Sequence, residues 1–144
     1  MRNGLGILIS LFCFMAEAQL APAGWEILDD VKFETRYVEE AGGEYFFPVV
    51  NNDLKGIIGK SITIKGYYIP VEMEGNAIII SKYPYTSCFF CGGAGPQSVA
   101  AVKVEGKIGE YYLDELITVQ GRFSVNATDV DMLNFIIEDA KIID

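Results

Sequence analysis

The chain has 144 residues, of which 22% are charged, with a net charge of −9 and no histidine. The lack of histidine excludes general-base catalysis by imidazole, Cys–His nucleophilic pairs and histidine-rich metal sites. The acidic balance leaves no basic stripe that could displace counterions from nucleic acid, so we expect no nucleic-acid partner.

Residues 1–18 have the pattern of a cleaved signal peptide. Arg2 gives a short positive region, and an apolar run without charge follows from Leu5 to Met15. Ala16 and Ala18 are small residues at the positions that precede a cleavage site. The apolar run is too short to span a bilayer, which needs about 20 residues. We therefore expect an exported protein, periplasmic or secreted.

The residue before Cys13 argues against a lipid anchor, so we expect an exported chain with no stable membrane anchor. Phe12 precedes Cys13, whereas a lipid-anchoring cysteine requires a small residue at that place. Cys13 leaves with the signal peptide, so the mature chain keeps Cys88 and Cys91. Residues 19–144 are the length of a single domain.

Strand patterns occupy most of the mature chain. Period-two alternation of apolar and polar residues is clearest over residues 116–125, which indicates one buried and one solvated face. The predicted strands are 31–37, 45–50, 61–70, 77–81, 99–104, 116–125 and 135–143. Short helical turns are predicted at 25–28, 53–57 and 128–133.

These strands predict an all-β fold, specifically a small OB-like Greek-key barrel with an N-terminal extension and few short helices. Gly66 and Gly121 lie inside strand patterns, where a strand bends around a barrel corner. The residues expected to face the core are Ile62, Ile64, Ile117, Val119 and Phe123.

Three stretches carry a family resemblance. They are 54–56 with 59–70, 81–85 running into 88–96, and 134–140. Together they resemble a family of exported proteins from Bacteroidetes-type bacteria. That family is distantly similar to periplasmic OB-like proteins found near ABC-type export or metal-uptake systems.

The most specific part of this resemblance is Cys-Phe-Phe-Cys-Gly-Gly-Ala-Gly-Pro at 88–96, and the likeness begins at about Trp25. The resemblance implies an OB-like fold, a periplasmic location and an envelope partner such as a transport system. It implies no activity. The chain departs from the family pattern at Gln97, where an acidic residue is usual, which puts any scheme that needs a carboxylate there in doubt.

Cys88 and Cys91 form a C-x-x-C pair with three open interpretations. The oxidising compartment favours a local disulfide. A metal site is the second, because two thiolates suffice for Cu(I), whereas Zn(II) needs further ligands such as Glu72, Glu74 or Glu105, or a second subunit. A redox dithiol is the third, and the glycines after the pair disfavour the helix that would lower a thiol pKa.

Two features flank the cysteines. Gly92 to Gly95 could form an anion-binding nest, but a tight turn that lets the backbone pass closely is the preferred interpretation. The second feature is a group of aromatic residues: Tyr83, Tyr85, Phe89 and Phe90, with Tyr67 and Tyr68 nearby. These rings could stack on a ligand, pack in the core or hold a hydrophobic segment of a partner.

The sequence therefore predicts an exported, non-enzymatic binding or accessory module. It has no candidate catalytic residues, and its C-x-x-C loop would serve envelope metal handling, with zinc or copper, or export. The alternatives are a thiol–disulfide redox protein and a structural envelope protein whose loop disulfide is inert. No small-molecule ligand is indicated.

Overall fold

The computed structural model describes residues 24–143. The predicted signal peptide, residues 1–18, and its cleavage site lie outside the described residues. Within the described part, no helix combines the length and the apolar character needed to cross a membrane.

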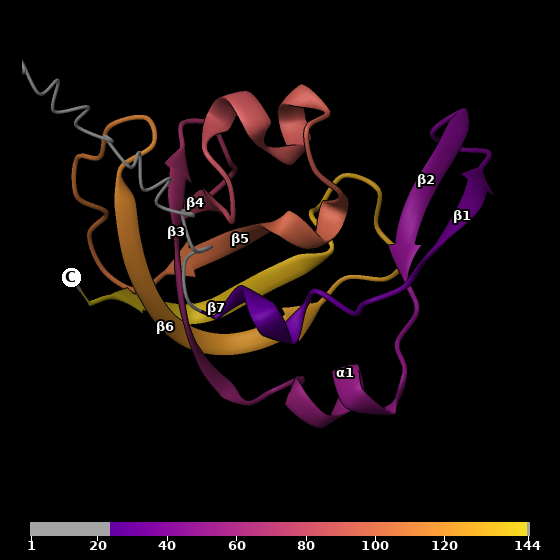
Figure 1. Ribbon diagram of the computed structural model, residues 1–144, viewed down its shortest axis with the longest axis horizontal. Helices are drawn as coiled ribbons and strands as arrows, with labels where there is room; N and C mark the ends of the chain where they lie inside the picture. Colours follow the sequence, from indigo (N-terminus) through magenta and orange to yellow (C-terminus); the bar gives the residue numbers. More distant parts are fainter. Residues whose placement is uncertain (1–23, 144) are drawn as a thin grey trace, which may run out of the picture.

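Five strands close into one barrel in the order β3-β4-β5-β7-β6 (Figure 1). Neighbouring strands are antiparallel except β5 and β7, which run parallel. This closed Greek-key arrangement is an OB-like barrel, and it confirms the predicted fold class. The strands are β3 (Ser61–Ile69), β4 (Ala77–Ser81), β5 (Val99–Val104), β6 (Leu116–Val125) and β7 (Phe135–Ile142).

The N-terminal extension precedes the barrel and contains a separate hairpin. The 3₁₀ turn η1 (Trp25–Ile27) leads to β1 (Phe33–Val38) and β2 (Gly43–Pro48), which pair only with each other within the described residues. Figure 1 shows this hairpin projecting away from the barrel. The short helix α1 (Asn52–Ile57) then returns the chain to β3. Both hairpin strands were predicted, but their position outside the barrel was not.

Apolar side chains of the barrel strands form the core. Ile64, Ile117, Val119 and Phe123 are buried as predicted, and Ile62 is partly buried against them. Trp25 from η1 is also buried, and its indole N–H donates to the carbonyl oxygen of Lys65 at 2.7 Å. Further core residues are Leu28, Ile80, Val102 and Phe135. The N-terminal extension therefore contributes to the barrel core rather than lying on its surface.

The sequence predicted that Gly66 and Gly121 mark bends at barrel corners, and in the structure both lie where two β-strands approach closely. A Cβ atom at Gly121 would lie 2.7 Å from the carbonyl oxygen of Glu138 on β7. At Gly66 it would lie 3.0 Å from the carbonyl oxygen of Ser81 on β4. Both contacts are with backbone atoms, so these positions exclude larger residues without a shift of the neighbouring strand.

One predicted element is wrong. Residues 128–133 form turns and bends instead of a helix. The side chain of Asn126 explains this, because its oxygen accepts from the backbone N–H groups of Thr128 and Asp129 at 3.2 and 2.9 Å. Such side-chain bonds to the backbone compete with helical hydrogen bonding.

Candidate functional site

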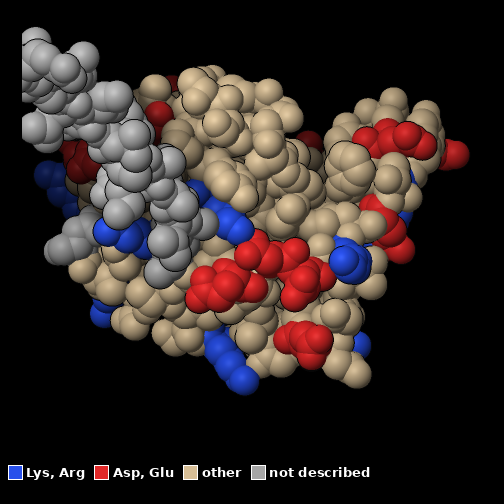
Figure 2. Space-filling model, in the orientation of Figure 1, with Lys and Arg blue, Asp and Glu red and all other residues tan. Residues whose placement is uncertain are grey.

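The β4–β5 connection, residues 83–98, forms a compact lobe that we call the C-x-x-C lobe. It contains three single-turn 3₁₀ segments that the sequence did not predict, η2 (Tyr85–Ser87), η3 (Phe89–Cys91) and η4 (Pro96–Ser98). The chain has no charged residue between Lys82 and Lys103. Figure 2 shows this lobe as an uncharged surface at the top of the molecule. The lobe exposes the aromatic rings of Tyr83, Tyr85 and Phe90 and offers no charge to pair with a phosphate group.

The two cysteines lie in different environments. Cys88 is fully buried, Cys91 is exposed, and both are free thiols in the structure. They are joined by one 3₁₀ turn, in which the Cys91 N–H donates to the Cys88 carbonyl oxygen at 3.2 Å. Only Cys91 therefore presents its sulfur to solvent.

Two of the three carboxylates that the sequence offered as further metal ligands lie away from the cysteines. Glu74 and Glu105 line a separate hollow together with Glu138 and Asp139. Neither cysteine is among the residues that line it. Within residues 24–143, no three or more His, Cys, Asp or Glu side chains are grouped so as to hold a metal ion.

Thiol accessibility gives the first testable prediction. In reduced native protein, iodoacetamide should alkylate Cys91 rapidly and Cys88 only after denaturation, because a buried thiol is shielded from the reagent. Peptide mass mapping measures both sites. The Cys91→Ser variant is the control and should show no rapid labelling. Equal rates at the two cysteines would contradict the buried position of Cys88. In a parallel sample purified without reductant, labelling that appears only after reduction would identify a disulfide.

The glycine run after the cysteines forms a tight turn. Gly92 has a φ of 75° and ends η3 in the left-handed region, which favours glycine. The Gly93 N–H donates to the Cys88 carbonyl oxygen at 3.1 Å, and a Cβ at Gly93 would lie 2.6 Å from the carbonyl oxygen of Ser87. The glycine run thus folds the lobe back on itself, in agreement with the prediction of a tight turn that lets the backbone pass closely.

Lys82 fixes the base of the lobe. Its ammonium donates to the carboxylate of Asp29, which belongs to the N-terminal extension, and lies 5.7 Å from the centre of the Tyr83 ring. Burial of the ammonium disfavours its charge, but the hydrogen bond and the charge of Asp29 outweigh burial and raise the pKa of Lys82. A charged pair at Lys82, the residue before the lobe, therefore attaches the lobe to the extension.

An apolar cleft of about 270 Å³ lies between the C-x-x-C lobe, the hairpin and the β6–β7 connection. Figure 2 shows the notch between the uncharged lobe and the projecting hairpin. Three segments far apart in the sequence supply its walls. The lining residues are Glu44, Tyr45, Phe46, Phe47, Phe89, Pro96, Val99, Asp129, Val130, Met132, Leu133 and Asn134.

The hairpin wall is held against the β6–β7 connection by two hydrogen bonds. Arg36 donates from Nη1 to the carbonyl oxygen of Ala127 at 3.0 Å, and Asn134 donates from Nδ2 to the carbonyl oxygen of Phe46 at 3.3 Å. The Arg36 guanidinium also lies 4.5 Å above the ring of the buried Phe47. These contacts hold the hairpin wall in place, and the walls of binding pockets are usually largely pre-formed.

The wall formed by the β6–β7 connection is organised by Asn126. Besides accepting the two N–H groups described above, its amide donates to the carbonyl oxygens of Asp129 and Met132 at 2.7 and 3.1 Å. These bonds hold the loop in a form that leaves the Met132 side chain 37% exposed beside the cleft. One asparagine thus determines the shape of this wall.

The charged groups among the lining residues are both acidic. Glu44 comes from β2 and Asp129 from the β6–β7 connection, and the other lining residues are uncharged. An apolar pocket with carboxylates at its edge suits a ligand that combines an apolar group with a nearby positive charge.

The sequence pattern predicted only part of this site. It named Phe89, but not the hairpin residues or those of the β6–β7 connection. The predicted aromatic cluster is divided, because Phe89 packs on Phe90 at 5.6 Å and Tyr68 packs on Tyr111 at 5.8 Å. The one available signal was Phe46-Phe47, an adjacent apolar pair in a strand, which places one ring on each face.

Comparison with protein-family models, with curated proteins and with solved structures finds no match to this chain.

Proposed function

We propose that the protein is an exported accessory module that binds an apolar segment of an envelope partner protein. The observation that carries this proposal is the apolar cleft between the hairpin, the C-x-x-C lobe and the β6–β7 connection. Its walls come from Phe46, Phe89 and Leu133, among others. A pocket lined mainly by apolar side chains with few polar groups is typical of binding sites.

The position of the cleft in the fold supports the proposal. OB-like barrels bind extended ligands beside the loops at one end of the barrel, and the β6–β7 connection corresponds to the loop between the last two strands of such a barrel. Here the acidic rim and the net charge of −9 favour a protein segment over nucleic acid.

In this proposal the C-x-x-C loop acts through its shape. Phe89 from η3 and Pro96 from η4 line the cleft, while the buried Cys88 anchors the lobe between them. The loop thus serves the partner as one wall of the binding cleft, and the state of its thiols affects binding through the position of Phe89.

The test is selection of a phage library of random short linear peptides on immobilised wild-type protein. We expect enriched peptides with an aromatic or aliphatic residue beside a basic one. The Phe46→Ala variant should bind them at least about tenfold more weakly, because it removes an aromatic wall of the cleft. Titration followed by fluorescence polarisation measures the affinity.

The matched control is Tyr37→Ala. Tyr37 is an exposed aromatic of the same hairpin, 65% exposed against 56% for Phe46, and it does not line the cleft. Its replacement should leave peptide affinity unchanged. Failure to enrich any peptide, or equal loss of binding in both variants, would refute the cleft as the binding site.

A further inference from the structure

The backbone of β2 has one edge that β1 does not use. The Val49 N–H donates to the Lys32 carbonyl oxygen at 2.8 Å, so these opposed residues form a hydrogen-bonded pair. Hydrogen-bonded and non-hydrogen-bonded pairs alternate along an antiparallel ladder. With the observed register, Tyr45 and Phe47 face β1, while Glu44 and Phe46 direct their N–H and C=O groups away from it.

Two observations agree with this assignment. The Phe46 carbonyl oxygen accepts a hydrogen bond from the side chain of Asn134, outside the hairpin. Pro48, which has no N–H, occupies another outward position of the same strand, where proline is tolerated.

Three backbone groups of Glu44 and Phe46 have no hydrogen-bond partner outside the hairpin among residues 24–143. They are the N–H and C=O of Glu44 and the N–H of Phe46. The same residues line the apolar cleft. A free strand edge beside a side-chain pocket is the arrangement by which proteins bind extended peptides as an added strand.

We propose that β2 takes up an extended, basic peptide segment of a partner protein as a third strand. The segment pairs with the backbone of Glu44 and Phe46, places an apolar side chain in the cleft, and sets a Lys or Arg near Glu44 and Asp129. This inference rests on the proposed function and specifies how the cleft recognises its partner.

The charge of the hairpin favours a basic segment over a second copy of this chain. Residues 33–48 carry four glutamates and one arginine, and Figure 2 shows the acidic groups on the hairpin. Arg36 is already paired with Glu34 at 2.6 Å. Pairing of two β2 edges would bring the Glu44 carboxylates of both copies together, and like charges on facing strands are destabilising.

The first experiment blocks the edge. Glu44→Pro removes the Glu44 N–H at an outward position like that of Pro48, and it should weaken the selected peptides at least about tenfold. Tyr37→Pro is the matched control, because Tyr37 lies opposite Glu44 and faces the other edge of the hairpin. It should leave affinity unchanged. Glu44→Gln keeps the backbone N–H. Compared with wild type, this variant should bind the peptides more weakly at low salt, and the difference should be small at high salt.

The second experiment leaves the protein unchanged, so it remains decisive if Glu44→Pro does not fold. Each backbone amide of a selected peptide is N-methylated in turn. Strand addition predicts that methylation weakens binding at the amide that donates to the Glu44 carbonyl oxygen and not at the amides on either side of it, because alternate amides face β2.

Equal loss at adjacent amides, or no loss at any amide, while Phe46→Ala still binds the peptides weakly, would overturn strand addition and leave the cleft function standing. Loss of the Phe46 dependence as well would overturn both. Concentration-dependent dimerisation that Glu44→Pro abolishes would show that a second copy occupies the edge, and would overturn the peptide assignment.

Discussion

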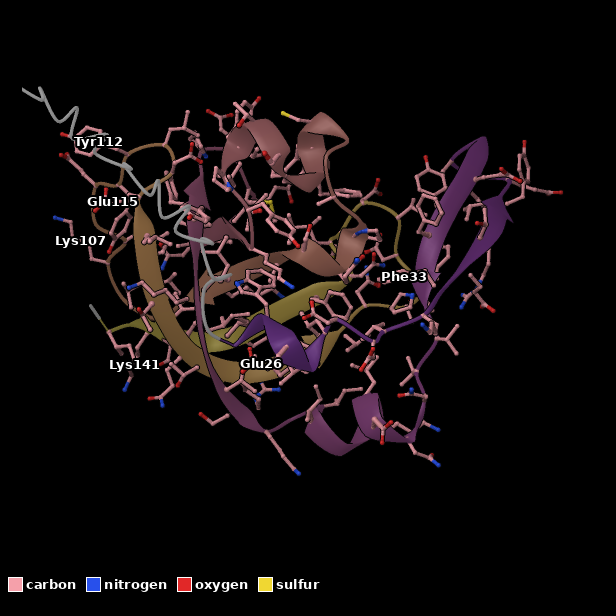
Figure 3. The ribbon with its side chains drawn as sticks, viewed as in Figure 1. Glu26, Phe33, Lys107, Tyr112, Glu115 and Lys141 are labelled. Carbon is pink, nitrogen blue, oxygen red and sulfur yellow. The ribbon has the colours of Figure 1, made fainter. Side chains whose placement is uncertain are left out.

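Replacing Phe123 with alanine is expected to lower the free energy of unfolding by about 3–5 kcal/mol. Phe123 is 1% exposed, and its ring stacks on that of Phe135 at 5.9 Å. Phe135 in turn contacts Phe33 edge-on at 6.1 Å, at the base of the hairpin (Figure 3). Truncation would leave a cavity in the core and remove one member of this aromatic series.

Urea unfolding followed by circular dichroism measures the loss. The control is Tyr112→Ala, because Tyr112 is 79% exposed and lies at the periphery of the barrel (Figure 3). Its replacement should change stability by no more than about 0.5 kcal/mol. Since Phe33 is at the start of β1, Phe123→Ala should also weaken peptide binding in the cleft. Similar stability for the two variants would contradict the burial of Phe123.

Replacing Gly121 with alanine is expected to destabilise the protein by about 3 kcal/mol. The added Cβ would lie 2.7 Å from both the Glu138 carbonyl oxygen and Cγ2 of Ile137, and 3.0 Å from Cα of Ala140. Two of these three atoms belong to the β7 backbone, which cannot move away without disturbing the β6–β7 ladder. The ladder already shifts register between Gln120 and Arg122 at this point.

Gly56→Ala is the matched control for this prediction. Gly56 lies in α1, and a Cβ there would meet nothing within 4 Å. The substitution should stabilise the protein by about 0.5–1 kcal/mol, because alanine is the better helix former. Opposite signs for the two glycine substitutions, measured by urea unfolding, are the expected result. A neutral Gly121→Ala would show that β6 and β7 are farther apart at this place than the structure has them.

The periodicity of single strands accounts for much of what the sequence predicted correctly. Residues 77–81, 99–104 and 116–125 were predicted with the bounds that the structure shows, because each is a short apolar or alternating run between turn residues. The error at residues 128–133 has a local cause too, in the hydrogen bonds of Asn126. A weak helical pattern did not compete with them.

The sequence by itself determined the strands, the two glycines within them and the position of the C-x-x-C pair, since these depend on local backbone preferences and on alternation. Only the tertiary structure decided that β1 and β2 stand outside the barrel, that Cys88 is buried while Cys91 is exposed, and that Phe46, Phe89 and Leu133 share one cleft. These residues come from three segments, and what joins them is barrel closure and the bonds from Arg36 and Asn134 to backbone carbonyls. The local sequence pattern carries no information about such contacts. The burial of a side chain depends on which distant residues the folded chain brings against it.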